Sequence, residues 1–364
     1  MAKISMHKKI LQISPFPPPR SGWSVRVAFL KSALCELGHQ CQVLNIGSSR
    51  KMKSPEYVCV YNALDYLVKV VKFSAQGYTI HAHVNGETLK GLLLILVAGM
   101  SNWLFGKRYV LTFHGGVQQS YFTPETGHRL TPLFRLMFAL SQRIICNSEV
   151  VKAKIAAYGV NPDKITPIPA FTRQYLQHET VTFAPPLEAF LAGHTPVLLS
   201  YIVFRDGFFI DTLIEGFRQL RASYPEAGLL LVGTESDGSP LETDIRNRIA
   251  AANLEPHVFD VPSMSHDEFR TAMKRCDLYV RTPITDGVCS SVLEALSYNL
   301  PVVAAENGSR PPSVIPYIAD DPQDLATQAA NTLAHLDHIR QQIVKPAIQD
   351  TLSDEVNLLI QAAT

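Results

Sequence analysis

Short apolar runs alternate with stretches of helical spacing along the first half of the chain. Ile10 to Ile13 is a strand-length apolar run, and Val25 to Leu37 carries apolar residues at three- and four-residue intervals until Gly38. Further strands are predicted over Gln42 to Ile46, Tyr57 to Tyr61, Thr79 to His83, Tyr109 to Phe113, Ile144 to Asn147 and Ile165 to Pro169. Because such alternation favours parallel pairing with helices on both faces, we expect a doubly wound α/β domain.

The second half repeats this alternation after a polar, proline-containing stretch from Gln174 to Pro196. Strands are predicted over Pro196 to Val203, Gly228 to Val232, His257 to Val261, Asp277 to Arg281 and Pro301 to Ala305, with helices between them. We therefore predict two Rossmann-like doubly wound domains that face each other across a cleft. The first covers 1–175, a linker covers 176–195, the second covers 196–345, and 346–364 forms a C-terminal helix able to pack back on the first domain.

Apolar segments and cysteines bear on the cellular compartment. The most apolar stretch, Gly91 to Phe105, is shorter than the roughly 20 residues of a membrane-spanning helix. A buried core helix and a helix that docks on a membrane surface both fit it. The start of the chain shows no secretory signal, and the six cysteines are scattered without a C-x-x-C pair. These features predict a cytoplasmic protein with free thiols.

Charge is divided unevenly between the two halves. Residues 1–175 contain 21 Lys and Arg against 7 Asp and Glu, a balance of +14. Residues 176–364 contain 12 against 25, a balance of −13, and the sums reproduce the totals of 33 and 32. The asymmetry indicates two separate domains and an anionic partner for the first. An anionic membrane surface and a lipid-linked pyrophosphate both fit, whereas no recognition motif for nucleic acid is present.

The densest set of candidate functional residues lies between 285 and 296. This segment leaves a predicted strand, passes through a short loop containing Gly287 and opens a predicted helix. Free N–H groups at the start of such a helix form a site for a diphosphate. Asp286 in the loop and Glu294 inside the helix are spaced to reach different parts of one extended ligand. Alternatively, Ser291 and Glu294 form a helix capping box and Asp286 is a solvated turn residue.

The same segment resembles the signature of glycosyltransferase family 4, in which two acids separated by seven residues precede a buried strand. Here the acids are Asp286, where the family usually has Glu, and Glu294, and the strand begins at Pro301. The resemblance implies the GT-B fold, with Asp286 as a catalytic residue at the hydroxyls of the donor sugar and Glu294 at the ribose. The other donor-binding residues that it implies are Gly287, Val288, Cys289, Ser290 and Ser291.

Three further segments carry the resemblance. Gly22 stands in a loop similar to the glycine-rich first loop of the family, and Gly233 ends a strand similar to its L-x-L-V-G strand. Both glycines are therefore expected to bind the donor. His114 follows a strand in a His-Gly-Gly sequence, which places it beside the donor sugar in the family. An imidazole there can donate a hydrogen bond to a hydroxyl or to developing charge.

Histidines also have a structural interpretation. For His114 the alternative is a buried ring whose polar atoms are satisfied by the backbone. For His81 and His83, which resemble a weaker feature of the family, the structural interpretation is the favoured one. A histidine inside a strand of a parallel sheet is more often a component of the core than a catalytic group.

One element of the family is changed in this chain. In the family an Arg and a Lys neutralise the donor diphosphate from a Gly-Arg-x4-Lys-Gly segment. The aligned residues here are Ser200, Tyr201, Asp206 and Gly207. An acid beside a diphosphate is repulsive by about 4 kcal/mol per close charge pair at an effective dielectric near 20. We expect Arg205 to supply the positive charge, with Arg281, Arg310 or an altered donor site as alternatives.

The features together predict a retaining, metal-independent glycosyltransferase that needs no cofactor. It would move a sugar from a nucleoside diphosphate sugar to a glycan or lipid-linked acceptor in bacterial cell-surface polysaccharide biosynthesis. The acidic cluster from Asp320 to Asp324 is interpreted as a helix-capping turn and not as a metal site. The basic domain would meet the acceptor on the inner face of the cytoplasmic membrane, through Lys51, Lys53, Lys69 and Lys72.

Two other functions fit the same sequence. A nucleotide-sugar epimerase has this architecture and requires a donor but no acceptor, so it gives no reason for so basic a first half. A non-catalytic nucleotide-sugar-binding protein on the same scaffold would tolerate Asp206 and the change to Asp at position 286. Turnover by the protein, lost on Asp286→Ala and Glu294→Ala, separates the enzymes from the binding protein.

Overall fold

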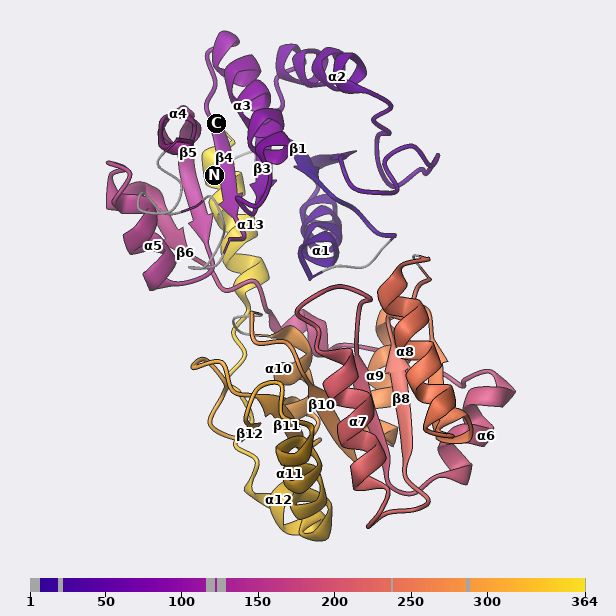
Figure 1. Ribbon diagram of the computed structural model, residues 1–364. Coiled ribbons are helices and arrows are strands. Elements are labelled where there is room, and N and C mark those ends of the chain that lie inside the picture. Colours follow the sequence, from indigo (N-terminus) through magenta and orange to yellow (C-terminus); the bar gives the residue numbers. More distant parts are fainter. Residues whose placement is uncertain are drawn as a thin grey trace. The chain divides into compact units, whose positions relative to one another are not determined.

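The computed structural model describes residues 7–18, 22–115, 122, 129–236, 238–285 and 289–363. The chain forms two compact units, one made of Met1–Gln174 with Gln349–Thr364 and the other of Tyr175–Ile348. Each unit contains one six-stranded sheet, and every strand pairing in the described residues is parallel (Figure 1). Two Rossmann-like α/β domains are therefore confirmed as the fold class.

The sheet of the first unit has the strand order β2-β1-β3-β4-β5-β6. Its strands are β1 (Lys9–Ser14), β2 (Gln40–Asn45), β3 (Thr79–Val84), β4 (Tyr109–Phe113), β5 (Ser141–Cys146) and β6 (Ile165–Pro167). The helices that cover it are α1 (Gly22–Glu36), α2 (Ala63–Ala75), α3 (Leu89–Leu104), α4 (Thr131–Leu140), α5 (Glu149–Ala156) and α13 (Thr351–Ala362).

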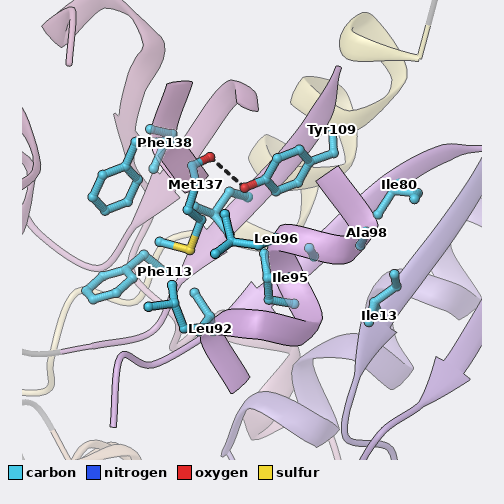
Figure 2. Close-up of a cluster of buried hydrophobic side chains, with 14 of the residues drawn as sticks. Ile13, Ile80, Leu92, Ile95, Leu96, Ala98, Tyr109, Phe113, Met137 and Phe138 are labelled. Atoms are coloured by element: carbon cyan, nitrogen blue, oxygen red, sulfur yellow. Dashed lines mark hydrogen bonds between the residues drawn. The ribbon is translucent and has the colours of Figure 1, made fainter. Parts of the chain in front are cut away.

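Alternate residues of these strands face two separate hydrophobic layers, because successive side chains of a strand point to opposite faces. Leu11 and Leu111 pack with α2, α3, α4 and α5, whereas Ile10 and Val110 pack with α1 and α13. Figure 2 shows part of the first layer, where the hydroxyl of Tyr109 donates a hydrogen bond of 2.6 Å to the carbonyl of Met137. Near-continuous apolar strands, buried on both faces, follow from this arrangement.

The last helix, α13, packs in the first unit although the chain reaches it through the second. Figure 1 shows this helix, in yellow, against the strands of the first unit. Leu352, Val356 and Leu359 lie in the same layer as α1, and burial of such side chains stabilises a fold by about 1.5–3 kcal/mol each. Glu355 of α13 also accepts a hydrogen bond of 2.8 Å from the guanidinium of Arg26, and both side chains are buried.

The sheet of the second unit has the order β12-β11-β10-β7-β8-β9. Its strands are β7 (Val197–Tyr201), β8 (Gly228–Val232), β9 (Val258–Val261), β10 (Leu278–Arg281), β11 (Val302–Ala305) and β12 (Ile315–Tyr317). Its helices are α6 (Pro185–Gly193), α7 (Ile210–Leu220), α8 (Pro240–Ala251), α9 (His266–Arg275), α10 (Ser290–Ser297), α11 (Pro322–Ala334) and α12 (Leu336–Gln342). Leu229 and Leu231 face α7 and α11, and Leu230 and Val232 face α6, α9 and α10.

Two segments differ from the pattern expected of the sequence. The strand predicted over Tyr57 to Tyr61 is wrong, since only Val58 forms an isolated parallel bridge, to Leu44 of β2. Its apolar residues Tyr57 and Val60 are buried against the body of the unit instead. The proposed linker 176–195 contains α6, which packs on the second sheet through apolar side chains.

The apolar stretch around α3 has two different faces. Leu92, Ile95 and Leu96 are buried in the core, which is the first of the two expected arrangements. On the other face Trp103 is 57% exposed and Leu104 is 73% exposed. Within the described ranges every helix is too short or too polar to cross a bilayer.

Candidate functional site

Both sheets reverse their strand order beside the first strand of the unit. In the second unit β7 has β8 on one side and β10 on the other, and in the first unit β1 has β2 on one side and β3 on the other. Ligands of open α/β sheets bind outside the carboxyl ends of the strands at such a switch point. Residues that follow β7 and β10, or β1, β3 and β4, are therefore the candidates for a binding site.

The N-terminus of α10 follows β10 at the switch point of the second sheet. The predicted residues Asp286, Gly287 and Val288 lie outside the described residues. Cys289 is the N-cap of the helix, and its side chain makes no capping hydrogen bond to the first turn. The hydroxyl of Ser291 instead accepts a hydrogen bond of 2.7 Å from Tyr279. The alternative capping box of Ser291 and Glu294 is therefore wrong, and among the described residues no side chain caps the first backbone N–H groups of α10.

Glu294 is buried one turn inside α10 and forms an ion pair with Arg270 of α9. Its Oε1 accepts a hydrogen bond of 2.5 Å from the guanidinium, which also donates to the carbonyls of Tyr175 at 2.9 Å and His266 at 3.2 Å. Burial raises the pKa of Glu294 to about 7, and Arg270 acts in the opposite direction. The carboxyl group predicted to contact a ribose is therefore held by a partner that the sequence did not point to.

Two arginines meet one aromatic ring at the carboxyl end of β7. The guanidinium groups of Arg205 and Arg281 each lie 5.3 Å from the centre of the Phe208 ring, a cation–π distance. Arg281 is buried and donates a hydrogen bond of 2.8 Å to the carbonyl of Tyr201, whereas Arg205 and Asp206 are exposed. The structure thus places the expected cation Arg205 beside one of its two alternatives.

Arg310, the other alternative, is engaged elsewhere. It donates hydrogen bonds to the backbone carbonyls of Ala305, at 2.9 Å, and Pro283, at 2.5 Å. These contacts tie the segment after β11 to the segment after β10, which is a structural task. The acidic cluster behaves as expected, because Asp321 caps α11 by accepting hydrogen bonds from the N–H groups of Gln323 and Asp324.

Gly233 ends β8 in a conformation that only glycine adopts without strain. Its φ is +92°, and an added Cβ would lie 2.3 Å from the carbonyl oxygen of Ile202 and 3.0 Å from the ring of Tyr201. The backbone at the ends of β7 and β8 approaches closely here. Gly233 therefore has a packing reason for being glycine in addition to the predicted donor contact.

A pocket of about 290 Å³ lies between α8 and the strands β8 and β9. It begins at Phe204 and Thr234, near the carboxyl ends of β7 and β8, and continues along β9 to Glu255. Arg246 lines it and pairs with Glu242 of the same helix at 3.0 Å and with Asp260 of β9 at 3.6 Å. Its mouth adjoins Gly233, and its walls are partly apolar.

His114 follows β4 in the first unit and contacts a second histidine. Its Nε2 lies 3.0 Å from Nδ1 of His83, and the His83 Nε2 lies 2.9 Å from Oε1 of Gln12. Burial lowers the pKa of His114 to about 3, with Glu355 acting in the opposite direction, and burial lowers the pKa of His83 as well. Both rings are therefore neutral at physiological pH.

His81 and His83 are fully buried, and His81 makes a hydrogen bond of 2.7 Å with Thr112. His81 therefore has the structural role that we favoured for it. His83 differs, because it links the interior of the sheet to His114. The structural alternative for His114 holds only for its main chain, whose N–H donates to the carbonyl of Val84 and whose carbonyl accepts from Asn147.

Gly22 is the first residue of α1 and is exposed. An added Cβ there would meet no described atom, so its surroundings give no packing reason for glycine. The neighbouring Trp23 sets its ring edge-on against His114, with ring centres 4.7 Å apart. Trp23 thus joins the carboxyl end of β1 to that of β4, a contact that the sequence pattern did not predict.

Arg270, His83 and Gln12 are the residues of these sites that sequence reasoning missed. Arg270 stands in the polar first turns of α9 and His83 and Gln12 stand inside strands, so none belongs to a motif. Only the long-range packing of α9 on α10 and of β1 on β3 brings them to their partners. A buried polar residue in an apolar strand, such as Gln12, was the one available signal.

Two family models match the chain. The model described as "Glycosyltransferase Family 4" matches residues 20–172, and the one described as "Glycosyl transferases group 1" matches residues 191–342. Among curated proteins, the gpi3 subunit of the phosphatidylinositol N-acetylglucosaminyltransferase of Schizosaccharomyces pombe is 26% identical over 56% of this chain and 44% of its own length. A human protein, named for the enzyme that carries out the same transfer, is 25% identical over 46% of this chain and 30% of its own length. The matches thus span less than half of these relatives.

Solved structures of similar fold cover nearly the whole chain. HepE of Anabaena in complex with UDP-glucose has a TM-score of 0.68 at 17% identity, with 98% of each chain covered. A glycosyltransferase of Rickettsia africae has a TM-score of 0.71 at 16% identity, covering 98% of this chain and 96% of that one. A UDP-N-acetylglucosamine 2-epimerase of Listeria monocytogenes, named as putative in its own description, has a TM-score of 0.66 at 13% identity, covering 98% and 96%. At these identities the likeness shows the fold and does not separate transferase from epimerase.

Proposed function

Because the chain belongs to glycosyltransferase family 4 and has its GT-B fold, we propose that it transfers a sugar from a nucleoside diphosphate sugar to an acceptor hydroxyl, with retention of anomeric configuration. The proposal makes the second unit the donor site and the basic first unit the acceptor site. The observation that carries it is the order of features along the carboxyl edge of the second sheet.

Three neighbouring strands supply these features in the order β10, β7 and β8. The uncapped start of α10 follows β10, Arg205 follows β7, and Gly233 ends the run after β8. Since paired strands lie about 4.8 Å apart, the features span roughly 10 Å, with the mouth of the pocket beyond them. An extended ligand would lie with its sugar nearest Asp286, its diphosphate nearest Arg205 and its nucleoside nearest Gly233.

The proposed chemistry needs charge stabilisation more than it needs a nucleophilic side chain. The acceptor oxygen bonds to the anomeric carbon while the bond from that carbon to the diphosphate oxygen breaks. The hydroxyl proton passes to the departing diphosphate, so that attack and departure occur on one face of the sugar. Arg205 and the first N–H groups of α10 would stabilise the negative charge of the leaving group. Asp286 would hold the donor sugar and Glu294 the ribose, by resemblance to the family.

Donor binding is tested by thermal unfolding with a panel of nucleoside diphosphates and their sugars. A ligand that binds only the folded state raises the midpoint of unfolding, so one nucleotide is expected to stand out. Arg205→Ala should weaken its binding, and Asp206→Ala, which removes the adjacent exposed carboxylate, should strengthen it. A flat response to every nucleotide would contradict the donor site.

Transfer is tested by incubating the protein with the stabilising donor and candidate acceptors, and by reading the anomeric configuration of the product by NMR. Retention of configuration is expected. Conversion of the donor to an epimer without an acceptor would favour the epimerase instead. Tight donor binding without turnover of any kind would favour the non-catalytic binding protein.

The exposed apolar face of α2 and α3 supports a lipid-linked acceptor. The two helices pack side by side, and their exposed large apolar residues include Leu64, Val68, Leu93, Met100, Trp103 and Leu104. Lysines of the same helices, Lys69, Lys72 and Lys90, lie among them. A Trp-containing apolar face with basic residues is typical of a surface that rests on an anionic membrane. Two curated relatives are named for transfer to phosphatidylinositol, also a lipid.

Membrane contact of this face, on the inner side of the cytoplasmic membrane, is tested by co-sedimentation with vesicles. Vesicles that contain anionic lipid should carry down the wild type at low salt, and neutral vesicles or high salt should release most of it. Trp103→Ser and Leu104→Ser should reduce binding to anionic vesicles, whereas Val150→Ser, at an exposed apolar site on α5, serves as the matched control. Equal binding by all three variants would contradict this orientation.

A further inference from the structure

A chain of hydrogen bonds runs through the first sheet from β1 to the residue after β4. Gln12 of β1, His83 of β3 and His114 belong to adjacent strands, and the parallel register places Gln12 opposite His81 and His83 opposite Thr112. The chain is short and continuous: Gln12 Oε1 to His83 Nε2 is 2.9 Å, and His83 Nδ1 to His114 Nε2 is 3.0 Å. Gln12 and His83 are fully buried, and His114 is partly exposed at the carboxyl end of its strand.

The chemistry of the first member fixes the proton on every later one. The Gln12 Oε1 is a carbonyl oxygen and can only accept, so His83 Nε2 carries the hydrogen and donates. Burial lowers the pKa of His83, so the ring is neutral and its Nδ1 bears a lone pair. His83 Nδ1 therefore accepts, and the donor must be the Nε2–H of His114. With its one hydrogen committed there, neutral His114 keeps a lone pair on Nδ1.

The orientation of the Gln12 amide has its own support. Reversing the amide would present its NH2 group to His83 and would invert every proton position along the chain. Burial raises the pKa of the Cys41 thiol on neighbouring β2 to about 12, and the Gln12 side chain lowers it by donating to the sulfur. The amide nitrogen is thus directed to Cys41, although it has no oxygen or nitrogen partner among the described residues. Its oxygen is left for His83.

Charged groups around His114 come from three elements. Glu355 of α13 raises its pKa, and Arg26 of α1 and His81 of β3 lower it, in addition to the larger effect of burial. Arg26 and Glu355 form a buried ion pair with each other, so their effects on the ring largely offset. The edge of Trp23 covers one side of His114 and contributes no charge.

We infer that Gln12 and His83 are positioning residues that hold His114 as its Nε2–H tautomer, so that His114 accepts a hydrogen bond from a substrate hydroxyl through Nδ1. This inference rests on the proposed sugar transfer and reverses the role given to His114 from sequence, that of a hydrogen-bond donor. A hydroxyl of the sugar matches an acceptor nitrogen, whereas a phosphate oxygen, which has no hydrogen to give at neutral pH, does not. His114 is thereby directed to the sugar and away from the diphosphate.

The first test reads the tautomers directly and needs no activity. Protein labelled with 15N at histidine is examined at neutral pH by long-range 1H–15N correlation NMR, and signals are assigned by comparison with His83→Asn and His114→Gln. A protonated Nε2 and a bare Nδ1 are expected for both His83 and His114. A protonated Nδ1 on His114, or exchange between tautomers in the wild type, would overturn the inference.

The second test uses variants that differ by one hydrogen bond. Gln12→Leu removes the acceptor for His83 and is expected to mix the tautomers of His114 and to lower kcat/KM for transfer about tenfold, the size of one lost hydrogen bond. His83→Leu should lose as much, and His83→Asn, whose side-chain oxygen can accept from His114, should recover part of it. His81→Gln, on the same strand and outside the chain, is the matched control. Equal activity of the Leu and Asn variants at position 83 would refute a positioning role.

The two tests separate this inference from the function on which it rests. The expected tautomers in a protein that transfers no sugar would support the hydrogen-bonded chain and contradict the transferase. Transfer with retention by a protein whose His114 carries the hydrogen on Nδ1 would support the transferase and overturn the chain. Circular dichroism of Gln12→Leu and His83→Leu checks that both variants fold before their kinetics are compared.

Discussion

The buried ion pair of Arg270 and Glu294 predicts an unusual dependence of stability on pH. The pKa of Glu294 is about 7 in the folded protein, raised by burial from an ordinary value of 4.5, and Arg270 limits the rise. Between these two values the unfolded chain loses the proton and the folded chain keeps it. Raising the pH through this window therefore favours the unfolded state, and the loss of stability is complete above pH about 7.

The size of this effect follows from the two pKa values. Their difference is about 2.5 units, and each unit corresponds to about 1.36 kcal/mol, so this one carboxyl group lowers the free energy of unfolding by roughly 3 kcal/mol between pH 4.5 and 7. Glu294→Gln keeps the shape of the side chain and removes the titration. Arg270→Met removes the only charge that opposes burial, so the pKa of Glu294 rises further and the decline continues above pH 7. At alkaline pH an unpaired buried carboxylate costs about 3–5 kcal/mol.

Urea unfolding at a series of pH values from 5 to 9 measures these differences. The wild type minus Glu294→Gln should decline from pH 5 to 7 and then become flat, because all other titrating groups cancel in the difference. The difference for Arg270→Met should continue to decline up to pH 9. If the three proteins lose stability in parallel across the whole range, Glu294 does not titrate near neutrality and the argument from its burial is refuted.

Three further predictions concern the backbone, the C-terminal helix and the donor diphosphate. Gly233→Ala should lower the free energy of unfolding by about 2 kcal/mol or more, because its φ of +92° and the close carbonyl of Ile202 leave no room for a Cβ, and urea unfolding measures it. Arg26→Met should cost about 3–5 kcal/mol by leaving Glu355 buried and unpaired, and the double variant with Glu355→Leu should recover much of this in the same assay; a double variant as unstable as the single one would contradict it. Asp206→Lys restores the cation of the family at an exposed site and should tighten nucleoside diphosphate binding by about 1 kcal/mol, roughly fivefold, in calorimetry, with unchanged affinity as the contrary result.

Periodicity predicted most of the regular structure because parallel strands leave a strong signal. Strands buried on both faces, such as Val197–Tyr201 and Gly228–Val232, are unbroken apolar runs with loops at each end. The same signal failed over Tyr57 to Tyr61, where an apolar run is buried by packing and not by pairing. Hydrophobicity reports burial, and pairing depends on whether a neighbouring strand has a free edge at that place.

Local sequence could not decide what a polar residue binds. The spacing of Ser291 and Glu294 fits a capping box, yet Ser291 bonds to Tyr279 and Glu294 to Arg270, both on other elements. A capping box competes with any stronger partner within reach, and a buried guanidinium is a stronger partner for a carboxylate than a backbone N–H. Which of the two is nearby is a property of the packing of α9 on α10.

The sequence alone determined the alternation of strands and helices, the charge difference between the halves and the motifs that indicate glycosyltransferase family 4, because each is written in neighbouring residues or in simple composition. Only the tertiary structure decided that α13 packs in the first unit through Arg26 and Glu355, that Arg205 and Arg281 share the ring of Phe208, and that His114 is bonded to His83. Each of these contacts joins residues from separate elements, 31 to 329 positions apart in the two hydrogen-bonded pairs. Burial then sets their protonation, since the same side chains in water would keep their ordinary pKa values and have no fixed partners.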